Sequence, residues 1–172
     1  MNTSNSVLDT SPGGSPVAQA TMPAERTIVH LVRHGEVDNP AGVLYGRLAD
    51  FHLSARGQAM ADRLATVLGP RDLAAVVSSP LERAVETAAP IAASCGLNVD
   101  VDERVIEASN VFAGTRLGNG ERLRDHLGLL TRLVNPFRPS WGEANVSVAA
   151  RMLAGAAAVR DRGAAHEAVL VS

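Results

Sequence analysis

Short apolar runs alternate along this chain with longer segments in which apolar residues recur every three or four positions. The short runs, rich in Val, Leu, Ile and Ala, predict strands at 27–32, 73–77, 97–101 and 168–171. The longer segments predict helices at about 54–68, 80–94, 121–133 and 148–159. Strands that alternate with helices are typical of the α/β class, with a mostly parallel sheet and helices on both faces.

Two helix starts carry specific signals. Ser54 is placed to cap the first helix, in which Met60, Leu64, Val67 and Leu68 form the apolar stripe. The run Ser79-Pro80-Leu81-Glu82 reads as a capping box with proline at the first helical position. Pro90 is expected to kink or shorten that second helix.

The first 25 residues have a different texture from the rest. They are rich in Ser, Thr, Asn, Gly and Pro without helical or strand periodicity, which predicts a disordered tail at 1–25 and one folded domain at 26–172. The segment also lacks the features of a secretory signal. No apolar run in the chain is long enough to span a membrane.

Charge and cysteine content exclude several classes of protein. All 16 basic residues are arginines, and 18 acidic residues bring the net charge to −2, so neither nucleic acid nor an anionic membrane is expected as partner. Cys95 is the single cysteine, which excludes an intramolecular disulfide and favours a reducing, cytoplasmic location. Cys95 itself reads as a small apolar residue at a helix end. Nothing in the sequence decides the oligomeric state.

Two positions suggest phosphate chemistry. Arg33-His34-Gly35 follows the first strand, and sites of parallel sheets gather at the carboxyl ends of strands. There an imidazole could attack phosphorus while an arginine fork binds the oxygens. Arg83 lies in the first turn of its helix, where a positive charge interacts unfavourably with the helix dipole. A bound anion would remove this penalty. Each position alone also fits a plain alternative, a strand end in solvent or a surface pair of Arg83 with Glu25, Glu82 or Glu86.

Three ordered motifs together resemble the histidine phosphatase superfamily, also called the phosphoglycerate mutase-like family. They are Leu31-Val32-Arg33-His34-Gly35-Glu36, then Leu53-Ser54-Ala55-Arg56-Gly57-Gln58-Ala59 with Gly46 and Asp50 before it, and Ser78-Ser79-Pro80-Leu81-Glu82-Arg83-Ala84-Val85-Glu86-Thr87-Ala88. The resemblance implies a three-layer α/β/α sandwich with a mostly parallel sheet. It covers nearly all of the chain after the tail.

The resemblance also implies a mechanism. His34 would be the phosphorylated nucleophile, Arg33 and Arg83 would bind the phosphoryl group, and Glu107 would be general acid and base, with Glu103 as a nearby competitor. The substrate would be a small phosphorylated metabolite, with no cofactor and no metal, and histidine spacing gives no metal signature either. A mutase working on sugar or glycerate phosphates is the nearest alternative to a phosphomonoesterase.

Departures from the family pattern leave two points open. Asn39 lies one residue earlier than the asparagine that contacts phosphate in the family, and the second essential histidine would follow Ser172, the last residue here. On that basis the carboxyl-terminal part of the domain is expected to be missing, and an inactive fragment or binding module is a further alternative. The remaining histidines read as follows: His30 faces away, His52 lies in a loop with nothing to fix it, and His126 and His166 are solvated. Phe137 and Trp141 are expected to pack locally in a Pro-rich loop.

Overall fold

The computed structural model describes residues 26–116 and 142–172. The predicted tail at 1–25, the predicted helix at 121–133, His126, and the packing of Phe137 and Trp141 lie outside the described residues. Within the described ranges, no helix combines the length and the apolar character that crossing a membrane requires.

Four parallel strands form one sheet in the order β1-β4-β2-β3. Their bounds are Ile28–Val32 for β1, Leu73–Ser78 for β2, Val99–Val101 for β3 and Glu167–Val171 for β4. The register aligns the last residues of neighbouring strands, with Val32 and Ser78 both beside Val171, and Ser78 beside Val101. All four carboxyl ends therefore meet at one edge of the sheet.

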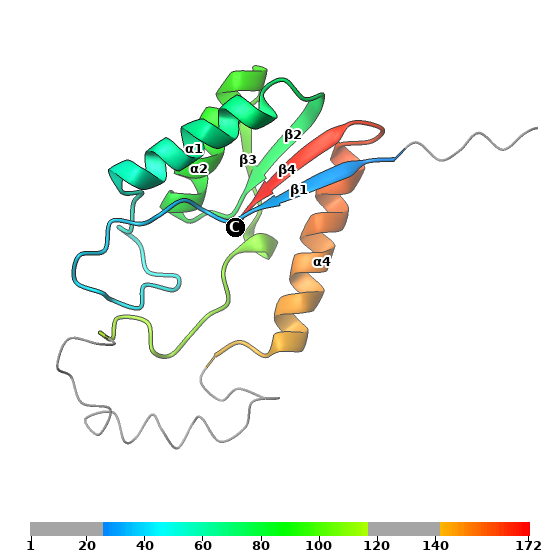
Figure 1. Cartoon of the computed structure of the whole chain (residues 1–172). Coiled ribbons are helices and arrows are strands. Elements are labelled where there is room, and N and C mark those ends of the chain that lie inside the picture. The colour runs from blue at the N-terminus through cyan, green and yellow to red at the C-terminus, as the bar shows by residue number, and fades with distance from the viewer. Residues whose placement is uncertain (1–25, 117–141) are drawn as a thin grey trace, which may run out of the picture.

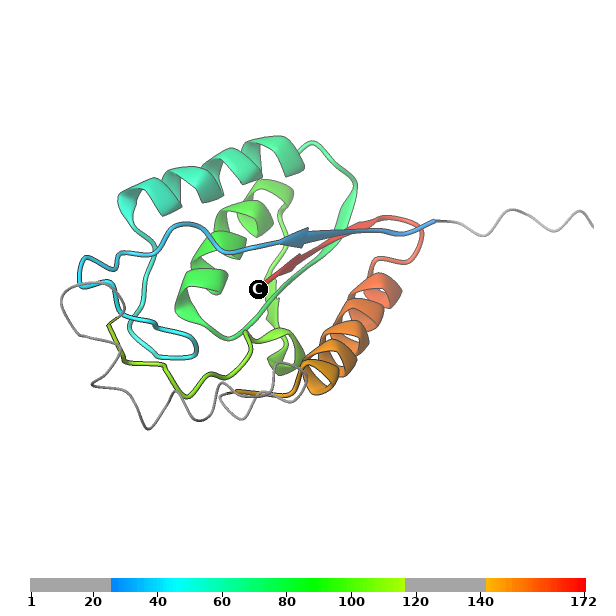
Figure 2. The same ribbon diagram turned by 60° about the horizontal axis from the view of Figure 1, so that its bottom comes forward.

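Helices cover both faces of this sheet, as predicted. Helices α1 (Ala55–Leu68) and α2 (Glu82–Cys95) pack together on one face, and α4 (Asn145–Arg162) packs on the other, next to the short 3₁₀ helix η1 (Glu103–Val105). Figures 1 and 2 show the three layers and the long loops at the carboxyl edge of the strands. The α/β class and the layered, mostly parallel architecture are thus confirmed.

The first strand corrects one expectation. An apolar run such as 27–32 predicts a strand buried on both sides, but β1 is an edge strand with Ile28 49% and Leu31 72% exposed. The central strands β4 and β2 are the buried ones. Apolar composition does not distinguish an edge from a centre, because that position depends on the order in which strands pair.

The packing face of α1 is also shifted from the predicted stripe. Met60 and Val67 are exposed, and the buried face consists of Gly57, Ala61, Ala65 and Leu68. This face meets small residues of α2, Ala84 and Ala88 among them, which are fully buried. Small side chains allow the two helices to approach closely, so residue size rather than hydrophobicity selects the buried face.

The start of α2 differs from the predicted capping box. The helix begins at Glu82 with Leu81 as its N-cap, and no side chain caps it. The Ser79 amide donates instead to the Val171 carbonyl (2.9 Å), so Ser79 continues the edge of the sheet and its buried hydroxyl has no partner. Ser54 does cap α1, accepting from the Gly57 amide, and α2 runs past Pro90 to Cys95 without being shortened.

The last helix follows its predicted apolar stripe except at two exposed positions, Ala149 and Leu153; the other stripe residues are Val148, Met152, Ala156 and Val159. Val159 is buried, and Met152 and Ala156 pack against the core as the stripe requires. Leu153 is 70% exposed, so it does not belong to the packing face. Gly155 takes its place, because a side chain there would collide with Val105.

Candidate active site

The strand ends at the carboxyl edge bond directly to the loops that follow. The His34 amide donates to the Ser172 carbonyl (2.9 Å), and the Ser172 amide donates to the Val32 carbonyl (3.0 Å). The Ser172 hydroxyl also donates to the Val105 carbonyl (2.8 Å). The backbone at His34 is therefore fixed by the sheet rather than by a free loop.

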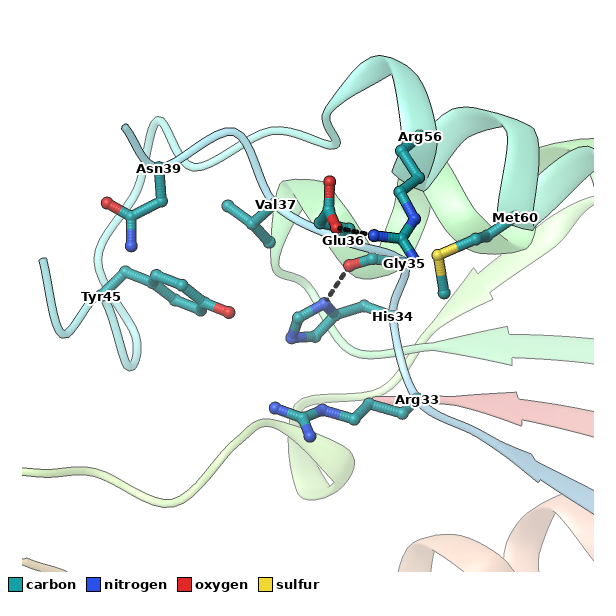
Figure 3. A pocket seen from close by; sticks show the side chains of 9 residues that line it. All are labelled: Arg33, His34, Gly35, Glu36, Val37, Asn39, Tyr45, Arg56 and Met60. Atoms are coloured by element: carbon teal, nitrogen blue, oxygen red, sulfur yellow. Dashed lines mark hydrogen bonds and ion pairs between the residues drawn. The ribbon is translucent and has the colours of Figure 1, made fainter. Parts of the chain in front are cut away.

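His34 is held in one ring orientation and one tautomer. Its Nδ1 lies 2.7 Å from the Gly35 carbonyl oxygen, and because a carbonyl only accepts, Nδ1 carries the proton (Figure 3). The Nε2 atom then keeps its lone pair. Burial lowers the pKa of His34, as do the charges of Arg83 and Arg33, while the Gly35 carbonyl and Glu107 oppose the shift. A neutral imidazole with one free nitrogen is suited to nucleophilic attack.

Two glycines bring the loop after His34 against the start of α1. A Cβ added to Gly35 would lie 2.7 Å from the Gly57 carbonyl oxygen. A Cβ added to Gly57 would lie 2.0 Å from the Glu36 carbonyl oxygen. The Ser54 hydroxyl donates to the Glu36 carboxylate (2.8 Å), which ties the same two segments. Both positions thus require glycine for close backbone approach.

Gly57→Ala is expected to lower the free energy of unfolding by about 1–3 kcal/mol, because the methyl group has no space against the Glu36 backbone. Urea denaturation measures this change. The control is Gln58→Ala, which alters the neighbouring exposed position and is expected to leave stability within about 0.5 kcal/mol of the unmodified protein. A Gly57→Ala protein as stable as the control would show that the contact is not as close as described.

Arg83 is the largest fully buried side chain among the described residues. Its Nη2 donates to the Glu107 carboxylate (2.8 Å) and to the Gly46 carbonyl, and its guanidinium lies 4.7 Å from the centre of the Tyr45 ring. Its Nε and Nη1 are buried, and neither has a hydrogen-bond partner in the part of the chain that the structure describes. Within the described ranges, Arg83 forms its ion pair with Glu107 and not with Glu82 or Glu86, and the alternative partner Glu25 lies outside the described residues.

The two acidic candidates after β3 lie in different surroundings. Glu107 is half-buried, pairs with Arg83 and lines the same pocket as Arg33. Glu103 is exposed in η1 and lines neither of the pockets beside His34. Of the two carboxylates, Glu107 and not Glu103 therefore shares a pocket with Arg33 and pairs with Arg83.

Arg33 and His34 face a common open space (Figure 3). A pocket of about 450 Å³ lies beside His34, between the loop that follows β1 and the start of α1. A second pocket of about 390 Å³ extends from Arg33 to Glu107. Tyr45 lines both, its ring edge-on to His34 with 6.2 Å between centres and packed against Phe51 at 5.1 Å. A phosphate and its leaving group would each find space here.

Asn39, whose role the sequence left open, lines both pockets but uses its amide within the loop. Its Nδ2 donates to the Val43 carbonyl (2.8 Å) and its Oδ1 accepts from the Val43 amide (3.0 Å). These two bonds close the turn that leads to Tyr45. In this arrangement Asn39 shapes the pocket wall.

The other described histidines each pair with a carboxylate. His30 pairs with Glu167 (2.5 Å) and faces away from the site as predicted, and His166, which is half exposed, pairs with Asp72 (2.6 Å). His52 corrects its prediction, because Glu86 fixes the ring and also accepts from the Leu53 amide (2.7 Å). The hydrogen bond between the His52 ring and the Glu86 carboxylate raises the pKa of His52.

Two further predictions concern Cys95 and metal binding. Cys95 is the last residue of α2 and half-buried, with weak contacts to Ser94 and Gly69. Over residues 26–116 and 142–172, no three His, Cys, Asp or Glu side chains gather as metal ligands.

Thr87 and Tyr45 are site residues that the sequence reasoning missed. The Thr87 hydroxyl accepts from the Gly35 amide (3.0 Å) and donates to the Arg83 carbonyl (2.7 Å), which joins the backbone after His34 to the backbone of Arg83. Thr87 lies four residues after Arg83, one helical turn, and that spacing is the signal that could have found it. Tyr45 is the single tyrosine of the chain, but its loop carries no periodic pattern.

Comparison with known proteins assigns this combination of fold and site. Residues 29–172 match the family model of the histidine phosphatase superfamily (branch 1), and the chain belongs to that family. Its members include phosphatases and phosphoglycerate mutase-like enzymes. The resemblance inferred from the three motifs is thereby confirmed.

The relatives include an uncharacterized protein of Mycobacterium tuberculosis, Rv0525, which is 53% identical over 148 residues, covering 86% of this chain and 73% of its own. The glucosyl-3-phosphoglycerate phosphatase of Mycobacterium tuberculosis is 36% identical over 129 residues, covering 70% of this chain and 55% of its own. A solved structure of the mycobacterial phosphatase of that name matches with a TM-score of 0.64 and 33% identity, over 83% of this chain and 71% of its own. That phosphatase has also been solved with inorganic phosphate. The chain thus spans just over half of one characterised relative.

Proposed function

We propose that this protein is a phosphomonoester hydrolase that works through a phosphohistidine intermediate on His34. The observation that carries the proposal is the fully buried Arg83, whose Nε and Nη1 have no hydrogen-bond partner among residues 26–116 and 142–172. A buried guanidinium with unpaired donors is costly unless an anion completes its hydrogen bonds. A phosphoryl group at His34 is such an anion, and a related phosphatase binds inorganic phosphate.

The first step uses three side chains. Nε2 of His34 attacks phosphorus, and the bond from phosphorus to the ester oxygen breaks as the N–P bond forms. Arg33 and Arg83 bind the phosphoryl oxygens and stabilise the charge that shifts onto them in the transition state. The proton stays on Nδ1, which donates to the Gly35 carbonyl, and this hydrogen bond holds the ring in line.

Glu107 supplies the proton that the leaving oxygen needs. It gives that proton to the alkoxide in the first step and removes one from water in the second, so the carboxyl returns to its starting state. Water then takes the phosphoryl group from Nε2, which releases inorganic phosphate. The carboxyl is placed for this exchange by its contact with Arg83 at the pocket that Arg33 also lines.

Rapid mixing of the protein with an aryl phosphate, followed by an alkaline quench, tests the proposal. We expect a mass increase of one phosphoryl group on the peptide that contains His34, and loss of that label in acid. Adding an alcohol in place of part of the water separates hydrolysis from the mutase alternative, since a phosphotransferase gives mainly the new ester. A label on another residue would overturn the assignment of His34.

The substrate is inferred only as a class. The site residues named here bind the phosphate that every candidate shares, whereas the remainder of the substrate would contact the loop that carries Tyr45. A small phosphorylated metabolite fits pockets of this size. A panel of metabolite phosphates, ranked by kcat/KM, identifies the preferred one.

A further inference from the structure

The backbone around Glu107 is held by arginine side chains from two other parts of the chain. Nε of Arg47 donates to the Glu107 carbonyl (2.5 Å), and Nη1 of Arg151 donates to the Arg104 carbonyl (2.8 Å) and to the Ile106 carbonyl. Three carbonyls in a run of four residues thus accept from guanidinium groups. Glu107 itself lies beyond η1, outside any helix or strand, so no regular ladder fixes it.

Glu143 joins these two arginines into one unit. Its Oε1 and Oε2 accept from Nε and Nη2 of Arg151 (2.8 and 2.9 Å), a two-bond fork, and its Oε2 also accepts from Nη2 of Arg47 (2.7 Å). The Arg151 hydrogen bonds lower the pKa of Glu143 to about 2. The side chains of Glu143 and Arg151 are each 17% exposed, which shields this fork from solvent. We name Arg47, Glu143 and Arg151 the arginine clamp.

We infer that the arginine clamp positions Glu107 for proton transfer, a role that rests on the proposed function. The clamp grips the main chain on both sides of the Glu107 side chain, while Arg83 contacts the carboxylate from inside the pocket. Proton donation requires the carboxyl to lie within hydrogen-bond reach of the leaving oxygen. A misplacement of about 1 Å can cost roughly a hundredfold in rate.

Leaving-group dependence separates a positioning role from a merely structural one. Phenyl phosphate releases a basic phenolate that needs a proton in the transition state, whereas dinitrophenyl phosphate releases a stable anion that does not. Loss of proton donation therefore slows the first ester selectively. Loss of phosphate binding, or of folded protein, slows both esters alike.

The test compares kcat/KM for these two esters in the whole chain and its variants. Glu143→Gln keeps the shape of the side chain but breaks the fork, because its amide nitrogen faces a guanidinium donor. We expect it to lower kcat/KM for phenyl phosphate by about 10- to 100-fold and for dinitrophenyl phosphate by less than about threefold. Glu107→Gln should show the same selectivity with a larger effect.

Two further variants keep the test decisive. Arg47→Gln removes a half-exposed arm of the clamp and should show the same selectivity even if Glu143→Gln folds poorly. Arg160→Gln is the matched control, an arginine on α4 whose pair with Asp161 is exposed to solvent, and should leave both rates unchanged. Thermal unfolding of each variant checks that the protein is folded.

The results separate the positioning role of the arginine clamp from the proposed phosphohistidine mechanism. Equal losses on both esters, or unchanged rates, in folded Glu143→Gln and Arg47→Gln proteins overturn the positioning role and leave the phosphohistidine mechanism standing. If His34→Ala hydrolyses both esters as fast as the unmodified protein, or the unmodified protein hydrolyses neither, the proposed function itself fails.

Discussion

Replacing His34 by alanine is expected to lower phosphate ester hydrolysis by at least about a thousandfold, because the nucleophile is removed. The fold should survive, since the backbone amide of residue 34 still donates to the Ser172 carbonyl. The Gly35 carbonyl that loses its partner lies at the pocket wall, where water replaces the imidazole. Release of phosphate from phenyl phosphate under saturating conditions measures the loss.

His166→Ala is the matched control for this experiment. His166 also pairs with a side chain, that of Asp72, but it is half exposed. It lies before the first residue of β4, at the opposite end of that strand from His34. We expect its activity to equal that of the unmodified protein within a factor of about two. Retention of full activity by His34→Ala in a folded protein would contradict the role of His34.

Replacing Arg83 by methionine is expected to separate stability from function. Arg83 is fully buried, and two of its nitrogens have no hydrogen-bond partner among the described residues, so burying its charge is costly. Methionine fills a similar space without that cost, and Glu107 is 40% exposed on its side chain, so its carboxylate gains water in place of the guanidinium. We expect the free energy of unfolding to stay within about 1 kcal/mol of the original or to rise.

The same substitution should weaken phosphate binding and turnover strongly. The loss of a charged donor at the transferring group is expected to lower kcat by about 100- to 1000-fold. Isothermal titration with inorganic phosphate and thermal unfolding with and without phosphate measure both effects. Arg162→Met removes a surface arginine that pairs with Asp100 and serves as control. An Arg83→Met protein that binds phosphate as well as the control would exclude Arg83 from the site.

Local signals in the sequence predicted much of the fold. Ser54 caps α1 because its hydroxyl meets an amide three residues away, and such a bond depends only on neighbours in sequence. Ser79 does not cap α2, because its amide bond to Val171, a residue more than ninety positions later, keeps it in the sheet and the helix begins only at Glu82. The edge position of β1 has the same origin, since only strand pairing decides it.

For the candidate site too, the sequence predicted some features, and contacts between distant parts of the chain decided the others. Motif order brought together Arg33, His34, Arg83 and Glu107; in the structure Arg33, His34 and Glu107 line adjoining pockets, and the buried Arg83 pairs with Glu107. The sequence did not predict that Glu107 would be the ion-pair partner of Arg83, nor that Arg151 would hold the Glu107 segment from α4. Both contacts join residues whose proximity is created by the sheet, and no spacing along the chain encodes it.

The in-register strand ends have a consequence for how this fold can change. In the proposed mechanism, the nucleophile His34 is fixed by backbone bonds among β1, β4 and β2, whereas the rest of the substrate would contact loops that contribute little to the sheet. Substitutions in those loops can therefore alter substrate choice while leaving the attacking nitrogen in place. Loop positions that help to hold Glu107, Arg47 among them, would be the exception, because a change there would alter the proposed chemistry together with selectivity.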